Sequence, residues 1–178
     1  MVKQQQEMIG YIELGEDDRL EILRSATGRD LYFALQAQSN GSSFEASLIQ
    51  TTCTHNGDRM TLDFIENLDA DIAVTMESVL FKSETLTPID ETGFPKTYQL
   101  GDHAVTVTRN RLIKDNSQAQ RMSGGDSASL AFWLLTFLVQ LDGKTLRYDD
   151  LMEMPAGKVQ ALIPLVTTKK REIVTPKT

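Results

Sequence analysis

The chain has 178 residues, of which 40% are apolar and 24% are charged, and its formal net charge is −7. This length is enough for one good core or two small ones, and the composition is ordinary for a globular protein. The acidic balance argues against a nucleic-acid-binding surface, which needs a stripe of basic residues. The charge is also uneven, because residues 1–86 hold six Lys or Arg against fifteen Asp or Glu, whereas residues 87–178 hold twelve against ten.

Three features indicate the compartment. The only cysteine, Cys53, excludes an intrachain disulfide and fits a reducing environment. Residues 1–11 lack the continuous apolar core of a secretory signal. The most apolar run, 130–141, is shorter than the roughly 20 residues that a membrane-spanning helix needs. We therefore expect a cytoplasmic protein that neither crosses a membrane nor binds nucleic acid.

The first half of the chain predicts a β-hairpin followed by helices. Apolar alternation indicates strands at 9–14 and 19–24, joined by a turn that contains Gly and Asp. Capping residues and helical apolar spacing then predict helices, which we place at 29–38, 44–54, 61–68 and 69–80. Asn56-Gly57 is expected to break the chain after the second of these helices.

The second half repeats this order after a break. Residues 83–97 are expected to form a linker, because they contain prolines and a glycine without helical periodicity. The elements expected next are a hairpin (98–100 and 104–109), a weakly helical stretch (112–122), an apolar helix (128–141), a short acidic segment (148–153) and a final helix that Pro155 opens. Residues 168–178 are expected to form a loose tail.

The two halves also align with each other. When the chain is shifted by 86 positions, residues 39–80 fall on residues 125–166 without a gap. Only five of the 42 pairs are identical, but Asn56-Gly57 falls on Asp142-Gly143 and the apolar positions coincide. We therefore expect an α+β, helix-dominated protein with two tandem pseudo-repeats, 8–82 and 98–167, each a β-hairpin followed by a helical hairpin. The alternative is that two unrelated helical hairpins share a common turn signal.

Residues that could carry catalysis are few. Cys53 and His55 lie two positions apart at an expected helix end, so they should point to different faces, and a buried thiol beside a surface imidazole explains them better. The acidic segments at 69–71 and 149–153 lack the spacing of an EF-hand and suit the first turns of helices. The Gly-rich segment 123–127 lacks the lysine of a phosphate-binding loop. We expect no catalytic residue, no metal site and no cofactor.

The remaining signal is the apolar helix. It can be interpreted as the central core helix of a two-repeat domain, or as a helix with one face turned to a partner. Trp133 and Phe137 are four residues apart, and their counterparts in the first half, Ser47 and Thr51, are polar. Aromatic anchors of this kind are typical of protein interfaces. The candidate partner-binding residues are Trp133, Phe137, Leu130, Leu134 and Leu141.

Several short motifs recur in the same order. The first half has Gly28-Arg29-Asp30-Leu31, Asn56-Gly57 and Thr61-Leu62-Asp63-Phe64-Ile65. The second half has Asp142-Gly143-Lys144-Thr145-Leu146, Tyr148-Asp149-Asp150-Leu151 and Met154-Pro155-Ala156. The order within each half resembles phage tail assembly chaperones and is also similar to the related assembly proteins of contractile-phage baseplate hubs. The second half departs from this pattern in having Lys114-Asp115-Asn116 instead of the Gly-Arg-Asp-Leu start, and the first half has Asp69 instead of the proline.

This resemblance implies a non-catalytic protein that binds apolar segments of a tail component in the host cytoplasm. The implied client is the tape measure protein, or a tube or baseplate hub subunit, which the chaperone would keep soluble until it polymerises. Two other hypotheses stand beside it: a permanent structural subunit of a tail or baseplate, and a stand-alone protein-binding adaptor domain. Self-association through the apolar helix is a further expectation.

Overall fold

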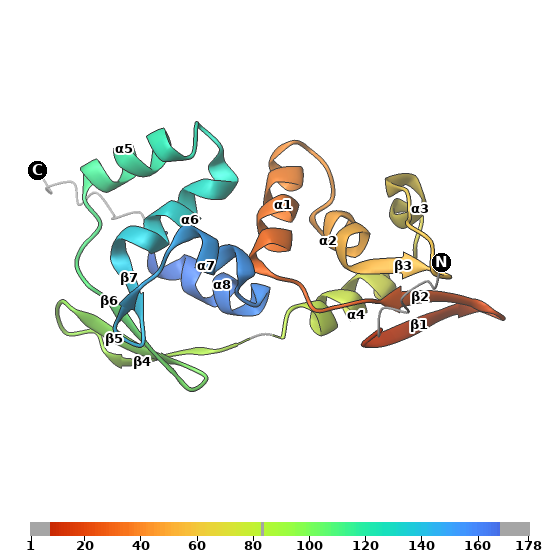
Figure 1. The fold of residues 1–178 in the computed structure, drawn as a ribbon, viewed down its shortest axis with the longest axis horizontal. Coiled ribbons are helices and arrows are strands. Elements are labelled where there is room, and N and C mark those ends of the chain that lie inside the picture. The colour runs from red at the N-terminus through yellow and green to blue at the C-terminus, as the bar shows by residue number, and fades with distance from the viewer. Residues whose placement is uncertain (1–7, 83, 168–178) are drawn as a thin grey trace, which may run out of the picture.

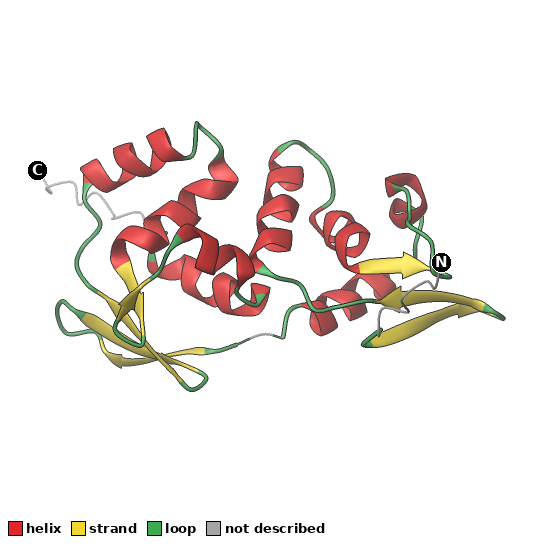
Figure 2. Cartoon of the chain, viewed as in Figure 1, coloured by secondary structure: helices red, strands yellow, loops and turns green. Residues whose placement is uncertain are grey.

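Helices dominate the α+β fold, which confirms the expected fold class (Figures 1 and 2). The structure is a computed structural model that describes residues 8–82 and 84–167. The tail expected at 168–178 lies outside the described residues. The ribbon is longer than it is wide, with one antiparallel sheet toward each end and helices between and above the sheets.

The first half forms a three-stranded sheet and four helices. Its strands pair in the order β1 (Gly10–Gly15), β2 (Asp18–Ile22) and β3 (Cys53–His55). Its helices are α1 (Gly28–Ser39), α2 (Phe44–Thr52), α3 (Leu62–Glu66) and α4 (Ala70–Leu80). Capping residues determine where three of these helices begin. The side chains of Ser43, Thr61 and Asp69 accept hydrogen bonds from backbone N–H groups of the first turn.

The second half has the same kinds of element around a larger sheet. Its strands pair antiparallel in the order β4 (Leu86–Asp90), β5 (Lys96–Leu100), β6 (His103–Val107), β7 (Val139–Leu141) and β8 (Lys144–Thr145). Its helices are α5 (Ile113–Met122), α6 (Ser127–Leu138), α7 (Tyr148–Glu153), α8 (Ala156–Leu162) and the 3₁₀ turn η1 (Ile163–Leu165).

Two helix ends and the linker differ from the sequence-based expectation. The helices expected to run to 54 and 141 stop at Thr52 and Leu138, because the residues that follow pair with β2 and β6 as strands β3 and β7. The segment 83–97 is not simply a linker, since β4 within it pairs with β5. Pro88 can occupy β4 because this strand lies at the edge of its sheet, where a missing N–H costs no ladder bond.

Apart from β4 and β8, which have no counterpart among the described residues of the first half, the two halves have the same order of strands and α-helices, and their strands pair in a similar register. In the first half Leu20 pairs with His55, and in the second Val105 pairs with Leu141. A backbone bond closes each sheet at the same place, from Leu23 N–H to Thr52 C=O at 3.0 Å and from Thr108 N–H to Leu138 C=O at 2.9 Å. This order agrees with two pseudo-repeats, whose superposition stays a prediction.

An ion pair between a buried aspartate and a partly exposed arginine lies at the start of the first long helix of each half. Arg24 binds the carboxylate of Asp30, which also accepts the backbone N–H of Thr27 at 2.8 Å. Arg109 binds Asp115 in the same way, and Asp115 accepts the N–H of Leu112 at 2.8 Å. The segment Lys114-Asp115-Asn116 therefore supplies the same carboxylate as the Gly-Arg-Asp-Leu motif of the first half. Asp30 and Asp115 are 85 positions apart, one less than the 86-residue shift that aligns the helices after them.

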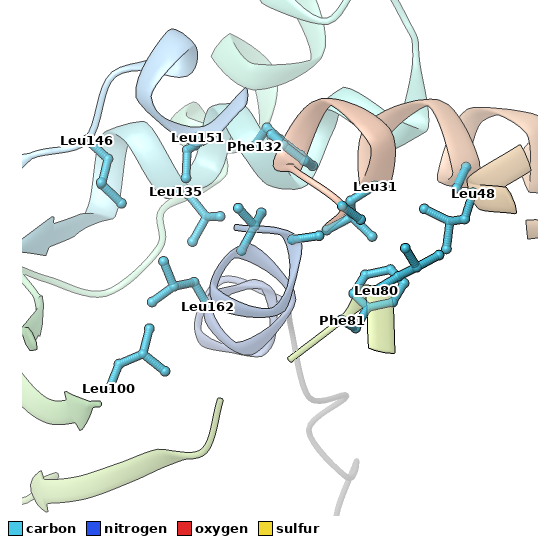
Figure 3. Packing of buried hydrophobic residues seen from close by; sticks show 14 of the residues in the cluster. Leu31, Leu48, Leu80, Phe81, Leu100, Phe132, Leu135, Leu146, Leu151 and Leu162 are labelled. Carbon is cyan, nitrogen blue, oxygen red and sulfur yellow. The ribbon is translucent and has the colours of Figure 1, made fainter. Parts of the chain in front are cut away.

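Helix α1 makes much of the contact between the halves. Helix α1 belongs to the first half but lies against α6, α7 and α8 of the second half. The backbone N–H of Gly28 donates to the carbonyl of Met154 at 2.7 Å, and the N–H of Ala156 donates to the carbonyl of Ala26 at 2.9 Å. Figure 3 shows buried side chains from both halves, among them Leu31, Leu80 and Leu162, within one continuous core.

Candidate functional site

Cys53 and His55 have different neighbours in the structure. Both lie on strand β3 and so share one face of the strand, which corrects the expected helix-end geometry. Cys53 is 3% exposed with its Sγ 3.4 Å from the hydroxyl of Thr52, and burial raises the pKa of its thiol to about 11. The His55 ring contacts the carboxylate of Asp18 through Nε2 and stacks on Phe64 with ring centroids 4.4 Å apart. The two side chains are therefore held by different partners.

His103 has a structural role at the turn after β7. Its Nδ1 lies 2.7 Å from Oδ2 of Asp142, whose other oxygen accepts the backbone N–H of Ala104 at 2.9 Å. These two hydrogen bonds lower the pKa of the Asp142 carboxyl. Asp142 has a φ of 50°, in the left-handed region, and its side-chain bonds fix the turn into β8.

The acidic segments act at helix ends. Asp69 caps α4 by accepting the N–H of Asp71 at 3.3 Å, and Asp150 pairs with Arg147 at 2.7 Å. In the Gly-rich segment, Asp126 caps α6. Within the ranges 8–82 and 84–167, no group of three or more His, Cys, Asp or Glu side chains is placed to hold a metal ion. Among these residues there is also no helix of the length and apolarity that a bilayer span requires.

The candidate partner-binding residues divide between surface and core. Leu134 is 3% exposed and lies in the core, so its assignment to a partner surface was wrong. Leu130 and Leu141 are half-buried against the core. Trp133 and Phe137 are half-buried neighbours with ring centroids 6.5 Å apart, and Trp133 stacks on Tyr148 at 4.4 Å. We call Trp133, Phe137 and Tyr148 the aromatic face.

A second apolar surface lies in the first half, where α2, α3 and α4 enclose a groove of about 420 Å³. We call it the open groove. Its apolar lining consists of Ala46, Ile49, Ile65, Leu68, Ala70, Ala73 and Val74. Its acidic rim consists of Glu45, Glu66, Asp69 and Glu77, all of them exposed. Sequence reasoning placed the three helices but missed the groove, because the space between helices depends on how they pack.

Comparison with known proteins gives no relative for this chain. No protein-family model, no curated protein and no solved structure matches it. A functional assignment therefore rests on the resemblance of its motifs and on the surfaces described above.

Proposed function

We propose that this protein is a non-catalytic phage tail assembly chaperone that binds an apolar segment of a tail component and keeps it soluble. The observation that carries the proposal is apolar surface that the fold covers only in part, at two places: the half-buried aromatic face on α6 and α7, and the open groove between α2, α3 and α4. Apolar surface gathered in patches and rimmed by polar residues is typical of protein-binding sites. The motifs shared with tail assembly chaperones support this class of partner.

The chemistry of these surfaces suits reversible binding. Trp133 is already held against Tyr148, so a partner that covers it gains apolar burial without ordering a free side chain. The groove has an apolar floor and a charged rim, which is the usual arrangement of a protein interface. A protein that binds only the unassembled client shifts the client away from aggregation by mass action. We place this activity in the cytoplasm, where a buried free thiol such as Cys53 is ordinary.

Co-expression tests the proposal. Candidate clients (a tape measure protein, a tube subunit and a baseplate hub subunit encoded near this chain) would each be expressed alone and together with it. The soluble fraction of one client should rise, and the two proteins should co-purify. If none of the clients gains solubility or forms a complex, the chaperone proposal is rejected.

The same system tests the alternative function, a structural subunit of the tail or baseplate. Such a subunit would bury the same apolar surfaces permanently. Mass spectrometry of mature particles separates the two functions, because a chaperone should be absent and a structural subunit should be present at fixed stoichiometry.

A further inference from the structure

The second half contains a groove that is already filled. Helices α6, α7 and α8 enclose it, and α1 of the first half occupies it. The occupant enters closely, because a Cβ on Gly28 would meet the carbonyl oxygen of Leu151 at 1.9 Å. Its backbone is bound on both sides, by Gly28 N–H to Met154 C=O and by Ala156 N–H to Ala26 C=O. The groove thus accepts a helix whose first residue is glycine and whose preceding residues are extended.

Side chains of α1 complete this contact. The ring of Tyr32 meets Phe132 edge-on at 6.2 Å, and its hydroxyl donates to the carboxylate of Asp126 at 2.7 Å. Arg29 forms an ion pair with Glu153 at 2.7 Å on the exposed side. The occupant is therefore an amphipathic helix with a tyrosine facing the groove and a cation at its edge.

The open groove lies at the same positions of the first half. A shift of 86 residues carries the lining residues Ala46, Ile49, Ile65, Leu68, Ala70 and Ala73 onto Phe132, Leu135, Leu151, Met154, Ala156 and Val159. Four of these counterparts lie against α1. The ring of Phe132 contacts Tyr32, and the carbonyl of Met154 accepts the N–H of Gly28. The carbonyl of Leu151 and Cγ2 of Val159 both lie beside Gly28. By the same shift, Leu68 and Ala70 correspond to Met154 and Ala156, whose backbone groups bind Gly28 and Ala26 at the start of α1. The open groove is thus the counterpart of the filled groove, without a helix in it.

The rims of the two grooves differ in charge. The rim residues Glu45, Glu66, Asp69 and Glu77 correspond to Ala131, Met152, Pro155 and Ile163 in the second half. Four carboxylates thus surround an apolar floor where the filled groove has neutral side chains. Charge complementarity favours an occupant with Lys or Arg beside its apolar face.

A second copy of this chain does not supply that helix. The counterpart of α1 is α5, in which Ile113 stands at the position of Gly28 and is 86% exposed. An isoleucine there would collide with a backbone carbonyl placed as that of Leu151 is. The tyrosine position is also polar in α5, where Ser117 replaces Tyr32. Helix α5 therefore lacks both the glycine and the tyrosine with which α1 enters its groove.

We propose that the open groove binds an amphipathic helix of a partner protein, with glycine at its first turn and basic residues flanking its apolar face. The proposal rests on the proposed function and names the site and the kind of client segment that this function would use. The N–H of that glycine would donate to the carbonyl of Leu68, and the carbonyl two residues before it would accept the N–H of Ala70, as Gly28 and Ala26 do with Met154 and Ala156. The partner helix would complete the first half as α1 completes the second.

The probe is a labelled synthetic peptide of residues 25–40, which spans α1, with Gln36→Lys and Gln38→Lys to supply positive charge. The full-length chain already fills its second groove with its own α1, so the open groove is the vacant site of this type. Fluorescence anisotropy should show saturable binding that weakens as salt is raised. The unmodified peptide should bind about threefold more weakly, and a Gly28→Ile version of the lysine peptide should bind at least about tenfold more weakly.

Variants of the chain locate the site. Glu66→Lys with Glu77→Lys should weaken peptide binding about tenfold, because both residues are exposed on the rim. Glu16→Lys with Asp102→Lys, two exposed positions outside the groove, makes the same change in net charge and should leave binding within about twofold. Ala73→Phe should block the groove, and thermal unfolding of each variant reports whether the fold survives.

The outcomes separate this inference from the proposed function. Equal binding of all peptides, or equal effects of the rim and control variants, overturns the groove proposal. So does self-association that the rim variant abolishes, measured by light scattering, because the occupant would then be a second copy. If wild type and rim variant solubilise a client equally, the chaperone function stands without the groove. If the peptide binds as expected but no client is solubilised, the groove stands without the chaperone function.

Discussion

The carbonyl oxygen of Leu151 lies 1.9 Å from the point where a Cβ on Gly28 would stand. Only glycine at this position lets the start of α1 come so near to α7, and the N–H of Gly28 then reaches the carbonyl of Met154 at 2.7 Å. A second close approach joins the halves at Gly157, whose Cβ would meet the carbonyl oxygen of Lys82 at 2.4 Å. Glycines thus set the distance between the two halves.

Gly28→Ala should lower the free energy of unfolding by about 3 kcal/mol, because the new methyl group forces α1 away from α7. Alanine favours helices by about 1 kcal/mol over glycine, so a helix-propensity effect alone would raise stability. Urea unfolding measures the difference. Gly93→Ala is the control, since its Cβ would meet nothing within 4 Å, and it should change stability by less than about 0.5 kcal/mol. A stable Gly28→Ala protein would show that α1 does not dock as described.

The second half should not fold cooperatively without α1. A fragment of residues 84–178 leaves Phe132 and Val159 without the helix that covers them, and exposing such apolar surface costs about 25 cal/mol per Å². Its circular dichroism should show a broad thermal transition. Adding the peptide of residues 25–40 should sharpen that transition and raise its midpoint. A fragment that unfolds sharply with no peptide present would argue that each half is an independent domain.

Asp115→Asn should destabilise the protein in a pH-dependent way. The hydrogen bonds from Arg109 lower the pKa of the buried Asp115 carboxyl from 3.8 to about 2. A depressed carboxyl pKa stabilises the fold above the unfolded value and loses that contribution as pH falls through the folded value. The variant should therefore lose about 2 kcal/mol at pH 7, and the difference should vanish between about pH 4 and pH 2. Asp102→Asn, at an exposed turn, is the matched control, and a pH-independent difference would contradict the assignment.

Trp133→Ala and Phe137→Ala should weaken client binding more than they weaken the fold. Truncating a fully buried aromatic costs about 3–5 kcal/mol of stability, and both rings are only half-buried. At an interface each change should cost about 2 kcal/mol of binding. Phe132→Ala is the control for a core aromatic, because Phe132 is 0% exposed, and it should mainly unfold the chain. Thermal unfolding and size exclusion with the client measure the two effects, and variants that simply unfold would make the aromatic face part of the core.

Cys53, His55 and His103 should be dispensable for function. A thiol with a pKa of about 11 carries almost no thiolate at pH 8, so native Cys53 should react with iodoacetamide far more slowly than the unfolded chain does. Alanine at each of the three positions should leave client solubility near wild type wherever the fold survives. Loss of function without loss of stability at one of them would reveal a catalytic role.

Local sequence determined where many elements begin and turn. Ser43 and Thr61 cap helices through their own side chains, and Asp142-Gly143 adopts the positive φ angles that its residue types allow. The apolar periodicity placed the helices, and the 86-residue shift placed the order of the two halves. These features depend on interactions within a few residues, which a sequence displays directly.

Tertiary structure decided which surfaces are covered. Leu134 and Trp133 are neighbours on one apolar helix, yet Leu134 is in the core and Trp133 stacks at the surface. Residues 53–55, expected to belong to the end of a helix, form strand β3 instead, because the edge of β2 supplies backbone hydrogen-bond partners for them. Helix α1 lies against α6, α7 and α8 of the other half, whereas the open groove between α2, α3 and α4 holds no helix from the part of this chain that the structure describes. Each of these outcomes depends on contacts between residues far apart in the chain, and the spacing of apolar residues in the sequence does not indicate such contacts.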